Sequence, residues 1–418
     1  MLRDEDAAVR VLAPSEQRFV RHGTYTGRSV SVTGVLDVAA LREAFAALQV
    51  AFPVIVCRIA EDGDGTGYLL PPGDSRDEAS VREGDAETVG LPGTPVSPGT
   101  QLAYLDAVVS GADRWRVTLY AHHSVADAGH CVELLSRFWG FYTDIVEATP
   151  ISVVPQGYPQ SLEWYVAERG ITAGPVSGFE DVTRPLVAAP VSVGDSGPSA
   201  LARPSRTRLD RAATARIIEL GRHRGVSVNG LVTAALLRAY ASETAGGPVH
   251  LGCLYPVDMR PRLDPPVAPA EGTNMAGLAS FAAEIDPSAS VLELAQRVSE
   301  RLRHDLADGV VQQSVLHFPD FFGDSRIHSL AGHVAITNTG AVPSFRTPAG
   351  LTLTDYEIVY LSAHPRPSAG ASAAVTFLVY TFDGRLAVGV LGADAERLLG
   401  AVHSELTALS AAERPTGS

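Results

Sequence analysis

Strand-like and helix-like segments alternate along this chain, and one stretch without a lasting period, residues 170–205, interrupts the alternation. That stretch is rich in Gly, Pro, Ser and Ala, and the parts on either side of it both predict mixed α/β units. Because 418 residues exceed what one ordinary hydrophobic core can hold, we expect two domains. We place them at residues 1–169 and 206–418, with 170–205 as the interdomain linker.

The first part predicts strands and helices in alternation. A helix begins at Val38, with Asp37 as its N-cap, and continues to about Val50, and a second helix covers Ala128–Val146. The predicted strands are Ser29–Val35, Val54–Ile59, Leu102–Val109 and Trp115–Ala121. The stretch Pro71–Gly99, which is rich in Pro and Gly, is predicted to be a surface loop.

The second part predicts a similar mixture. The helices are Ala212–Arg222, Ser227–Ala241, Val291–His304 and Asp394–Leu409. The strands are Val249–Pro256, Gly277–Ile285, His333–Thr337, Leu351–Tyr360, Ala373–Thr381 and Leu386–Leu391. An Asp383-Gly384 turn joins the last two as a hairpin, because Asp-Gly supplies the positive φ angles of a tight turn.

The composition excludes several classes of protein. All 33 cationic residues are arginine, so no side chain can supply the amine of a Schiff-base enzyme or the lysine of a P-loop. A net charge of −14 disfavours nucleic acid as a partner. Three widely spaced cysteines predict neither a disulfide framework nor a cysteine-rich zinc site, and they fit a reducing compartment.

Neither a transmembrane segment nor a signal peptide is predicted. No run of about 18 apolar residues occurs. The start, Met1–Arg10, is acidic and lacks an apolar region. We therefore expect a cytoplasmic chain, and we expect it to act as a monomer.

One segment, Tyr120–His130 (YAHHSVADAGH), concentrates side chains that can do chemistry. Because side chains alternate along the preceding strand, His123 shares a face with its apolar stripe, and His122 points the opposite way. Asp127 follows at the start of the next helix. An imidazole at a strand end can reach a cavity between layers, and imidazole is well matched to proton abstraction near neutral pH.

Other interpretations of these residues stay open. His122 can be an ordinary core histidine, and Asp127 can serve only as a helix N-cap. Together with His123 and His130 they could bind a metal ion, although adjacent histidines on a strand diverge and the sequence has no HExxH or CxxC motif. A Ser–His–Asp hydrolase is disfavoured because no GxSxG motif occurs.

The segment HHSVADA, residues 122–128, resembles the HHxxxDG motif of the condensation-domain and polyketide-associated-protein acyltransferase superfamily, whose distant relatives include chloramphenicol acetyltransferase. Other segments resemble family motifs in the family's order: Val32–Asp37 with Leu41-Arg42 and Ala51–Pro53, Val226–Leu231, Tyr255–Leu263, Gly272–Met275, Ile336–Gly340 and the Asp383–Arg385 hairpin. The resemblance thus extends from about residue 29 to residue 391. It implies two chloramphenicol-acetyltransferase-like α/β domains in a V-shaped pseudo-dimer with a central tunnel.

The resemblance also implies roles for the matching side chains. His123 would be the general base, with His122 as its neighbour in the motif. Asp127 would form an ion pair with Arg260 and hold the loop around the histidines. Taken alone, Arg260 has another interpretation, as a surface arginine in a Pro-rich loop.

Three further residues are candidates for the cleft. The backbone N–H groups near Ala128 and Gly129 lie at a helix N-terminus, where they could stabilise an oxyanion. Asn338 would line the cleft, and an ordinary turn-forming asparagine is the other interpretation.

The activity implied by the resemblance is that of a free-standing acyltransferase. It would move an acyl group from a CoA or acyl-carrier-protein thioester to a hydroxyl of a natural product or complex lipid and form an ester. The thioester would be a co-substrate, with no bound cofactor and no metal. Ala128 replaces the motif's usual Gly, which bears on peptide-bond condensation more than on acyl transfer. Four alternatives stay open: an amide-forming condensation enzyme, an epimerase-like relative, a metal-dependent hydrolase, and a non-catalytic condensation-like domain that recruits a partner protein.

Overall fold

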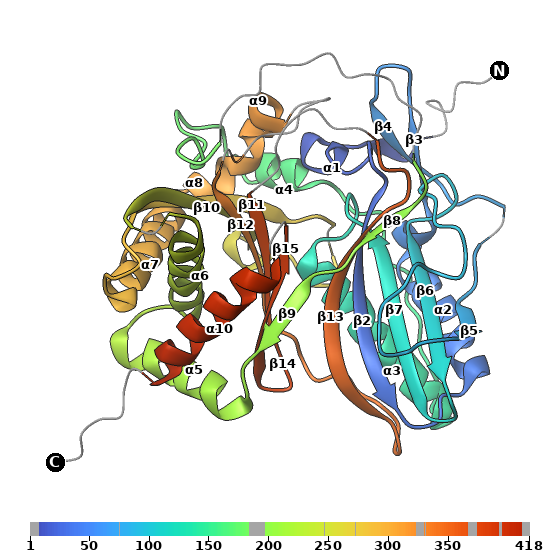
Figure 1. Ribbon diagram of the computed structural model, residues 1–418. Helices are drawn as coiled ribbons and strands as arrows, with labels where there is room; N and C mark the ends of the chain where they lie inside the picture. The colour runs from blue at the N-terminus through green and yellow to red at the C-terminus, as the bar shows by residue number, and fades with distance from the viewer. Residues whose placement is uncertain are drawn as a thin grey trace.

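Two six-stranded sheets stand side by side in the computed structural model, each with helices against it (Figure 1). The structure describes residues 8–74, 76–183, 197–245, 247–271, 273–322, 330, 332–366, 374–392 and 395–411. Parts of the sequence-based predictions lie outside these residues: most of the acidic start, the middle of the linker, Gly272, and the predicted first residues Ala373 and Asp394.

The first sheet has the strand order β5-β6-β7-β2-β13-β8. These strands are β5 (Ser80–Glu83), β6 (Ala103–Ser110), β7 (Arg114–His122), β2 (Thr24–Thr33), β13 (Thr352–Ser362) and β8 (Ala200–Ala202). The second sheet has the order β11-β10-β12-β14-β15-β9. Its strands are β11 (Ala276–Ile285), β10 (Val249–Asp258), β12 (Val334–Ala341), β14 (Val375–Phe382), β15 (Arg385–Leu391) and β9 (Ser205–Arg208). A small third sheet contains β1 (Arg10–Val11), β4 (Gly67–Leu70) and β3 (Arg58–Glu61).

Helices cover the sheets and close two large cores. Helices α2 (Val38–Ala51) and α3 (Ala128–Val146) bury their apolar faces in the core of the first sheet. The core of the second sheet contains residues of α5 (Arg211–Arg224), α6 (Val228–Thr244), α7 (Val291–Ala307) and α10 (Ala395–Ala411). The short helices are α1 (Pro14–Gln17), α4 (Leu162–Glu168), α8 (Val310–Gln313) and α9 (Phe318–Phe322), and 3-10 turns cover Pro53–Val56, Arg260–Arg262 and Ser314–His317.

The division between the sheets does not follow the sequence, because β13 comes late in the chain but lies in the first sheet. It pairs antiparallel with β2 from Thr24↔Ser362 to Thr33↔Thr352. The chain passes from one sheet to the other between β8 and β9, and ion pairs from Arg203 to Glu357 (2.6 Å) and from Arg206 to Asp355 (3.0 Å) fasten this crossing to β13. The boundaries 1–169, 170–205 and 206–418 stay a prediction.

Most of the predicted elements are confirmed, and the exceptions have local causes. Val54–Ile59 was predicted as one buried strand, which is wrong. Pro53 begins a 3-10 turn through Val56, and a strand begins only at Arg58. All three apolar residues after Pro53 are buried, so the run has no period that separates a strand from a tight helical turn. In the predicted loop Pro71–Gly99, β5 pairs parallel with β6 at the sheet edge.

The predicted hairpin turn and helix cap are also present. Asp383 and Gly384 have φ angles of 51° and 70°, as a tight hairpin turn requires. The Asp37 side chain accepts hydrogen bonds from the N–H groups of Ala39 and Ala40 at the start of α2.

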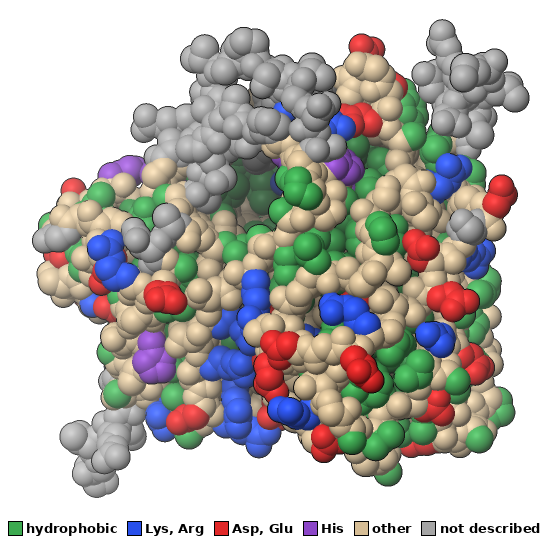
Figure 2. All heavy atoms as spheres, turned by 45° about the vertical axis from the view of Figure 1, so that its right-hand side comes forward, with side chains coloured by type: hydrophobic (Ala, Val, Ile, Leu, Met, Phe, Trp, Pro, Cys, Tyr) green, Lys and Arg blue, Asp and Glu red, His purple; other side chains and the backbone are tan. Residues whose placement is uncertain are grey.

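The surface of the molecule is hollowed on the face that Figure 2 shows. Hydrophobic side chains lie at the rim of this hollow, and a band of basic side chains lies below it.

Candidate active site

A cavity of about 370 Å³ opens where the loop after β7 meets strands of both sheets. One side of its wall comes from the second sheet and combines apolar residues, such as Leu254, Pro256 and Leu278, with polar ones: Asp258, Thr337, Asn338 and Thr339. The other side comes from the first sheet and the start of α3: Arg28, His123, Asp127, Ala128, Gly129 and Tyr360. The structure therefore brings most of the sequence-predicted site residues to one cavity.

His123 is held in one orientation on this wall. Its backbone N–H donates to the carbonyl of Thr24 (2.8 Å), and its ring stacks on Phe19 with ring centroids 4.1 Å apart. Its Nδ1 lies 3.0 Å from the carbonyl oxygen of Ala126. Because a carbonyl oxygen can only accept, this contact places the proton on Nδ1 and leaves Nε2 as the basic nitrogen.

The surroundings of His123 keep its imidazole neutral. Burial lowers the pKa of His123 to about 4, and the positive charges of Arg18 and Arg28 act in the same direction. A general base has to be unprotonated to accept a proton, so nearly every molecule is in the competent state at neutral pH.

We expect the pH profile of kcat/KM to report this shift. His123 accepts a proton only above its folded-state pKa, so activity is expected to be flat from pH 8 to pH 6 and to decline with a midpoint near pH 4. Steady-state rates between pH 4 and pH 8 test this, with circular dichroism at each pH to follow acid unfolding. A midpoint near 6.5, the ordinary value for histidine, would contradict it.

Asp127 has both carboxylate oxygens occupied by partners other than the His123 ring. Oδ1 accepts the N–H of His130 (2.8 Å), which caps α3. Oδ2 accepts from Nη1 of Arg260 (2.8 Å) and from the N–H of Met275 (2.7 Å). Burial opposes the charged form, but Arg260 holds the pKa of Asp127 below its ordinary value. Asp127 is therefore a helix cap and an ion-pair partner at once.

Arg260 is 4% exposed, so the surface interpretation of this residue is wrong. Besides Asp127, its guanidinium donates to Asp258 (3.1 Å) and to the carbonyl of Thr273 (2.8 Å). The Asp127–Arg260 ion pair joins two segments that are 133 residues apart. It fixes the loop that carries His123 against the 3-10 turn after β10.

Two residues that complete this connection, Asn274 and Thr273, had no individual role in the sequence-based prediction. The Asn274 side-chain amide donates to the carbonyl of His123 (2.9 Å), and the Thr273 hydroxyl donates to the carbonyl of Ser124 (3.2 Å). Both residues lie in the segment that resembles a family turn, and that resemblance was the only signal in the sequence. They hold the backbone of the histidine loop from the second half of the chain.

His122 lies away from the cavity. It is fully buried, its Nδ1 accepts the N–H of Ser124 (3.3 Å), and its ring meets Tyr25 edge to face. Burial lowers the pKa of His122 to about 3, so the ring is neutral. His122 is therefore a core histidine, although its Nε2 has no hydrogen-bond partner among the described residues. His122 and His123 lie on different sides, as the alternation along the strand predicts.

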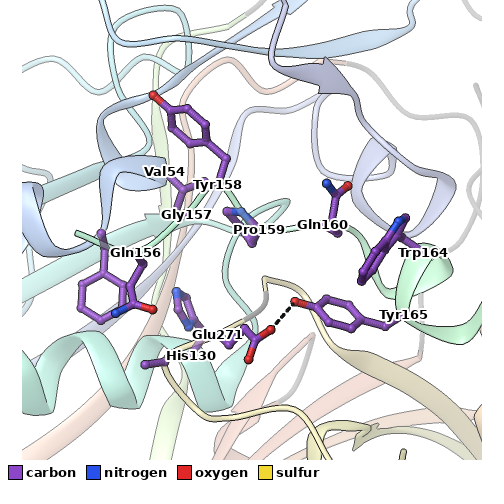
Figure 3. Close-up of a pocket in the computed structure, with 12 residues that line it drawn as sticks. Val54, His130, Gln156, Gly157, Tyr158, Pro159, Gln160, Trp164, Tyr165 and Glu271 are labelled. Atoms are coloured by element: carbon purple, nitrogen blue, oxygen red, sulfur yellow. Dashed lines mark hydrogen bonds between the residues drawn. The ribbon is translucent and has the colours of Figure 1, made fainter. Parts of the chain in front are cut away.

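His130 faces a second cavity of about 350 Å³, shown in Figure 3. Phe52, Trp164 and Tyr165 contribute aromatic walls to this cavity, and the Tyr165 hydroxyl donates to Glu271 (3.4 Å). None of its lining residues is shared with the cavity of His123. His130 therefore separates from His123 and Asp127 although it is close to them in sequence.

Ala128, Gly129 and Asn338 lie on the wall of the His123 cavity. As the first two residues of α3, Ala128 and Gly129 have N–H groups without an intrahelical acceptor. The Asn338 side chain donates to Asn229 (3.0 Å) and accepts the N–H of Gly340 (2.9 Å). Asn338 thus lines the cleft and shapes the local backbone at the same time.

Neither a metal-ligand cluster nor a membrane-spanning helix is found among the described residues. In the part of the chain that the structure describes, no three His, Cys, Asp or Glu side chains converge as a metal site would require. Among the same described residues, no helix combines the length and the apolar character that crossing a bilayer demands.

Comparison with known proteins identifies the family. A family model described as the C-terminus of phthiocerol/phthiodiolone dimycocerosyl transferase matches residues 198–391. The phthiocerol/phthiodiolone dimycocerosyl transferase of Mycobacterium bovis is 33% identical over 364 residues, which cover 84% of this chain and 85% of that protein. The chain belongs to this family of acyltransferases. The corresponding Mycobacterium leprae protein is 32% identical over 368 residues, with 84% of this chain and 86% of that protein covered.

Solved structures agree with this assignment. Polyketide synthase associated protein 5 from Mycobacterium tuberculosis superposes with a TM-score of 0.82 at 29% identity and covers 97% of this chain and 99% of that one. The first condensation domain of the CDA synthetase, at 16% identity and a TM-score of 0.64, covers 98% of both chains and shares the fold. The predicted fold, two chloramphenicol-acetyltransferase-like units in a pseudo-dimer, is confirmed, and the protein is an acyltransferase.

Proposed function

We propose that His123 is the general base of an ester-forming acyl transfer from a CoA or acyl-carrier-protein thioester to the hydroxyl of a lipid or other natural product. The observation that carries this proposal is the orientation of His123. Its Nδ1 is engaged by the Ala126 carbonyl, its pKa lies near 4, and the residue lines the cavity shared by both sheets. Relatives named as dimycocerosyl transferases support the choice of a lipid alcohol as acceptor.

The proposed reaction proceeds in two steps. Nε2 of His123 takes the hydroxyl proton while the acceptor oxygen attacks the thioester carbonyl, so a tetrahedral oxyanion forms beside an imidazolium. The N–H groups of Ala128 and Gly129 are the proposed donors to this oxyanion. When the intermediate collapses, the carbon–sulfur bond breaks and the thiolate takes the proton from Nε2. His123 is then neutral again, and the products are an ester and a thiol.

A three-arm assay tests this function. In the first two arms, the purified protein is incubated with acyl-CoA thioesters of graded length and with either a primary alcohol or the matching amine. In the third arm, a donor loaded on a carrier protein replaces the acyl-CoA. Alcohol-dependent release of CoA, with the ester detected by mass spectrometry, is the expected result. Product only with the amine would favour the condensation enzyme, and carrier binding without release would favour the recruitment domain.

We also propose that the chain acts as a monomer and is cytoplasmic. The mass of the purified protein in solution tests the first proposal, and fractionation of cells tests the second.

A further inference from the structure

One wall of the His123 cavity contains a buried arginine whose charge is not balanced. Arg28, in β2, is 1% exposed and lines the cavity. Its Nη1 donates to the Thr26 hydroxyl (2.5 Å) and to the carbonyl of Gly27 (3.4 Å), and its Nε has no acceptor within the described residues. Neither of these partners carries a negative charge.

The other buried arginines in the described part of the chain differ from Arg28 in this respect. Arg116, 3% exposed, has Glu357 at 3.7 Å, and Arg260 contacts both Asp127 and Asp258. Burial of an unpaired cation costs several kcal/mol, which is why buried charges normally have a partner. Asp127, the wall carboxylate that interacts electrostatically with Arg28, is already paired with Arg260. An anion supplied from outside would complete the site.

The charges around the cavity favour an anionic group in the same place. Arg18 lines the same wall and adds a second positive charge. The two carboxylates on the wall, Asp127 and Asp258, are neutralised in part by Arg260. Leu254, Pro256 and Leu278 are among the residues on the facing wall, and Arg28 itself is buried. A guanidinium in such surroundings is a strong and selective donor to a carboxylate, because the low local dielectric strengthens the attraction.

We propose that Arg28, which lines the same cavity as Arg18, binds a carboxylate group carried by one of the two substrates inside the cavity. This rests on the proposed acyl transfer and narrows its substrate class. The carboxylate can come from the donor, as the far end of a dicarboxylic acyl group, or from the acceptor, as a hydroxy acid. The chemistry at Arg28 is the same in both cases.

Two pairs of compounds separate these sources. Succinyl-CoA is compared with butyryl-CoA as donor, so that CoA itself contributes equally, and 6-hydroxyhexanoate is compared with 1-hexanol as acceptor. Binding is measured by calorimetry and turnover by release of CoA, so the first readout does not depend on the second. In one pair the carboxylate compound is expected to bind more tightly to the wild type, and Arg28→Met is expected to reduce that preference by roughly 10- to 100-fold. Arg28→Lys, which keeps the charge, should retain part of it.

The matched control is Arg114→Met, an exposed arginine in the neighbouring strand β7, which should leave the preference and the turnover unchanged. The proposal is overturned if the wild type binds both members of each pair equally. It is also overturned if Arg28→Met leaves the preference intact or weakens both members of a pair by the same factor. Preferential binding without any turnover would instead support the carboxylate site and contradict the acyl transfer.

Thermal unfolding separates this role from a structural one. A buried charge without a charged partner carries an uncompensated desolvation cost, and an apolar side chain of similar length removes that cost. Arg28→Met is therefore expected to unfold at the same or a higher temperature than the wild type in the absence of ligand. A lower unfolding temperature together with an unchanged carboxylate preference would show that Arg28 only supports the fold.

Discussion

Replacing His123 with alanine is expected to lower kcat by roughly 10²- to 10⁴-fold while the protein stays folded. Among the described residues, the ring donates a hydrogen bond to the Ala126 carbonyl and stacks on Phe19. It lies on a cavity wall rather than in a core, so its loss leaves few internal contacts unmade. Release of CoA under saturating donor and acceptor measures the rate. Circular dichroism and the unfolding temperature report on the fold.

Two variants act as controls for this result. His223→Ala makes the same change on the exposed face of α5 and should leave the rate unaltered. His122→Asn changes the neighbouring histidine, and its effect is expected on stability, because that ring is buried away from the cavity. Turnover near the wild-type level in His123→Ala would contradict the assignment of His123 as the general base.

The second large effect is expected at Asp127. Asp127→Asn removes the charge that Arg260 faces inside the protein, and breaking a buried pair in this way typically costs about 3–5 kcal/mol of unfolding free energy. The rate should also fall, because the same carboxylate holds Met275 and caps α3 next to His123. Denaturant unfolding and steady-state kinetics of the same preparation measure the two effects.

The matched control for this prediction is Asp258→Asn, which removes the second, half-exposed carboxylate partner of Arg260. Its cost should be much smaller, since water can replace the lost contact. The pH dependence gives an independent check. The folded-state pKa of Asp127 is depressed, so its contribution is complete above the unfolded value of about 3.9 and is lost as the pH falls through the folded-state pKa. Equal losses in the two variants would contradict a special role for Asp127.

Local patterns in the sequence predict much of this fold. Helix α3 covers Ala128–Val146 as its apolar spacing indicates, because an amphipathic helix is specified by residues three and four positions apart. The alternation along β7 was enough to assign His123 and His122 to opposite sides. The strand predicted at Val54–Ile59 was wrong because Val54–Val56 is buried on all sides, and such a segment has no hydrophobic period that separates a strand from a helical turn.

The parts of the site that depend on distant segments could not be predicted in this way. Asn274 holds the His123 carbonyl across 151 residues of sequence, and only the arrangement of the two sheets brings them together. Arg28 is a weaker case, because the alternation of side chains along β2 shows it to be unusual. It shares a face of β2 with Val30 and Val32, both buried in the core, so a charge occurs where an apolar residue would be expected.

The late strand β13 has a consequence for how the protein is made. Its Thr354 lies 323 residues after Ser31, the residue of β2 whose carbonyl its hydroxyl contacts. A ribosome that adds about 5–20 residues per second needs roughly 15 to 65 seconds to cover that separation. During this interval one edge of the ten-residue strand β2 has no neighbour and can pair with another chain. A fragment that ends before Thr352 would contain His123, Asp127 and Arg260 and would still leave that edge open.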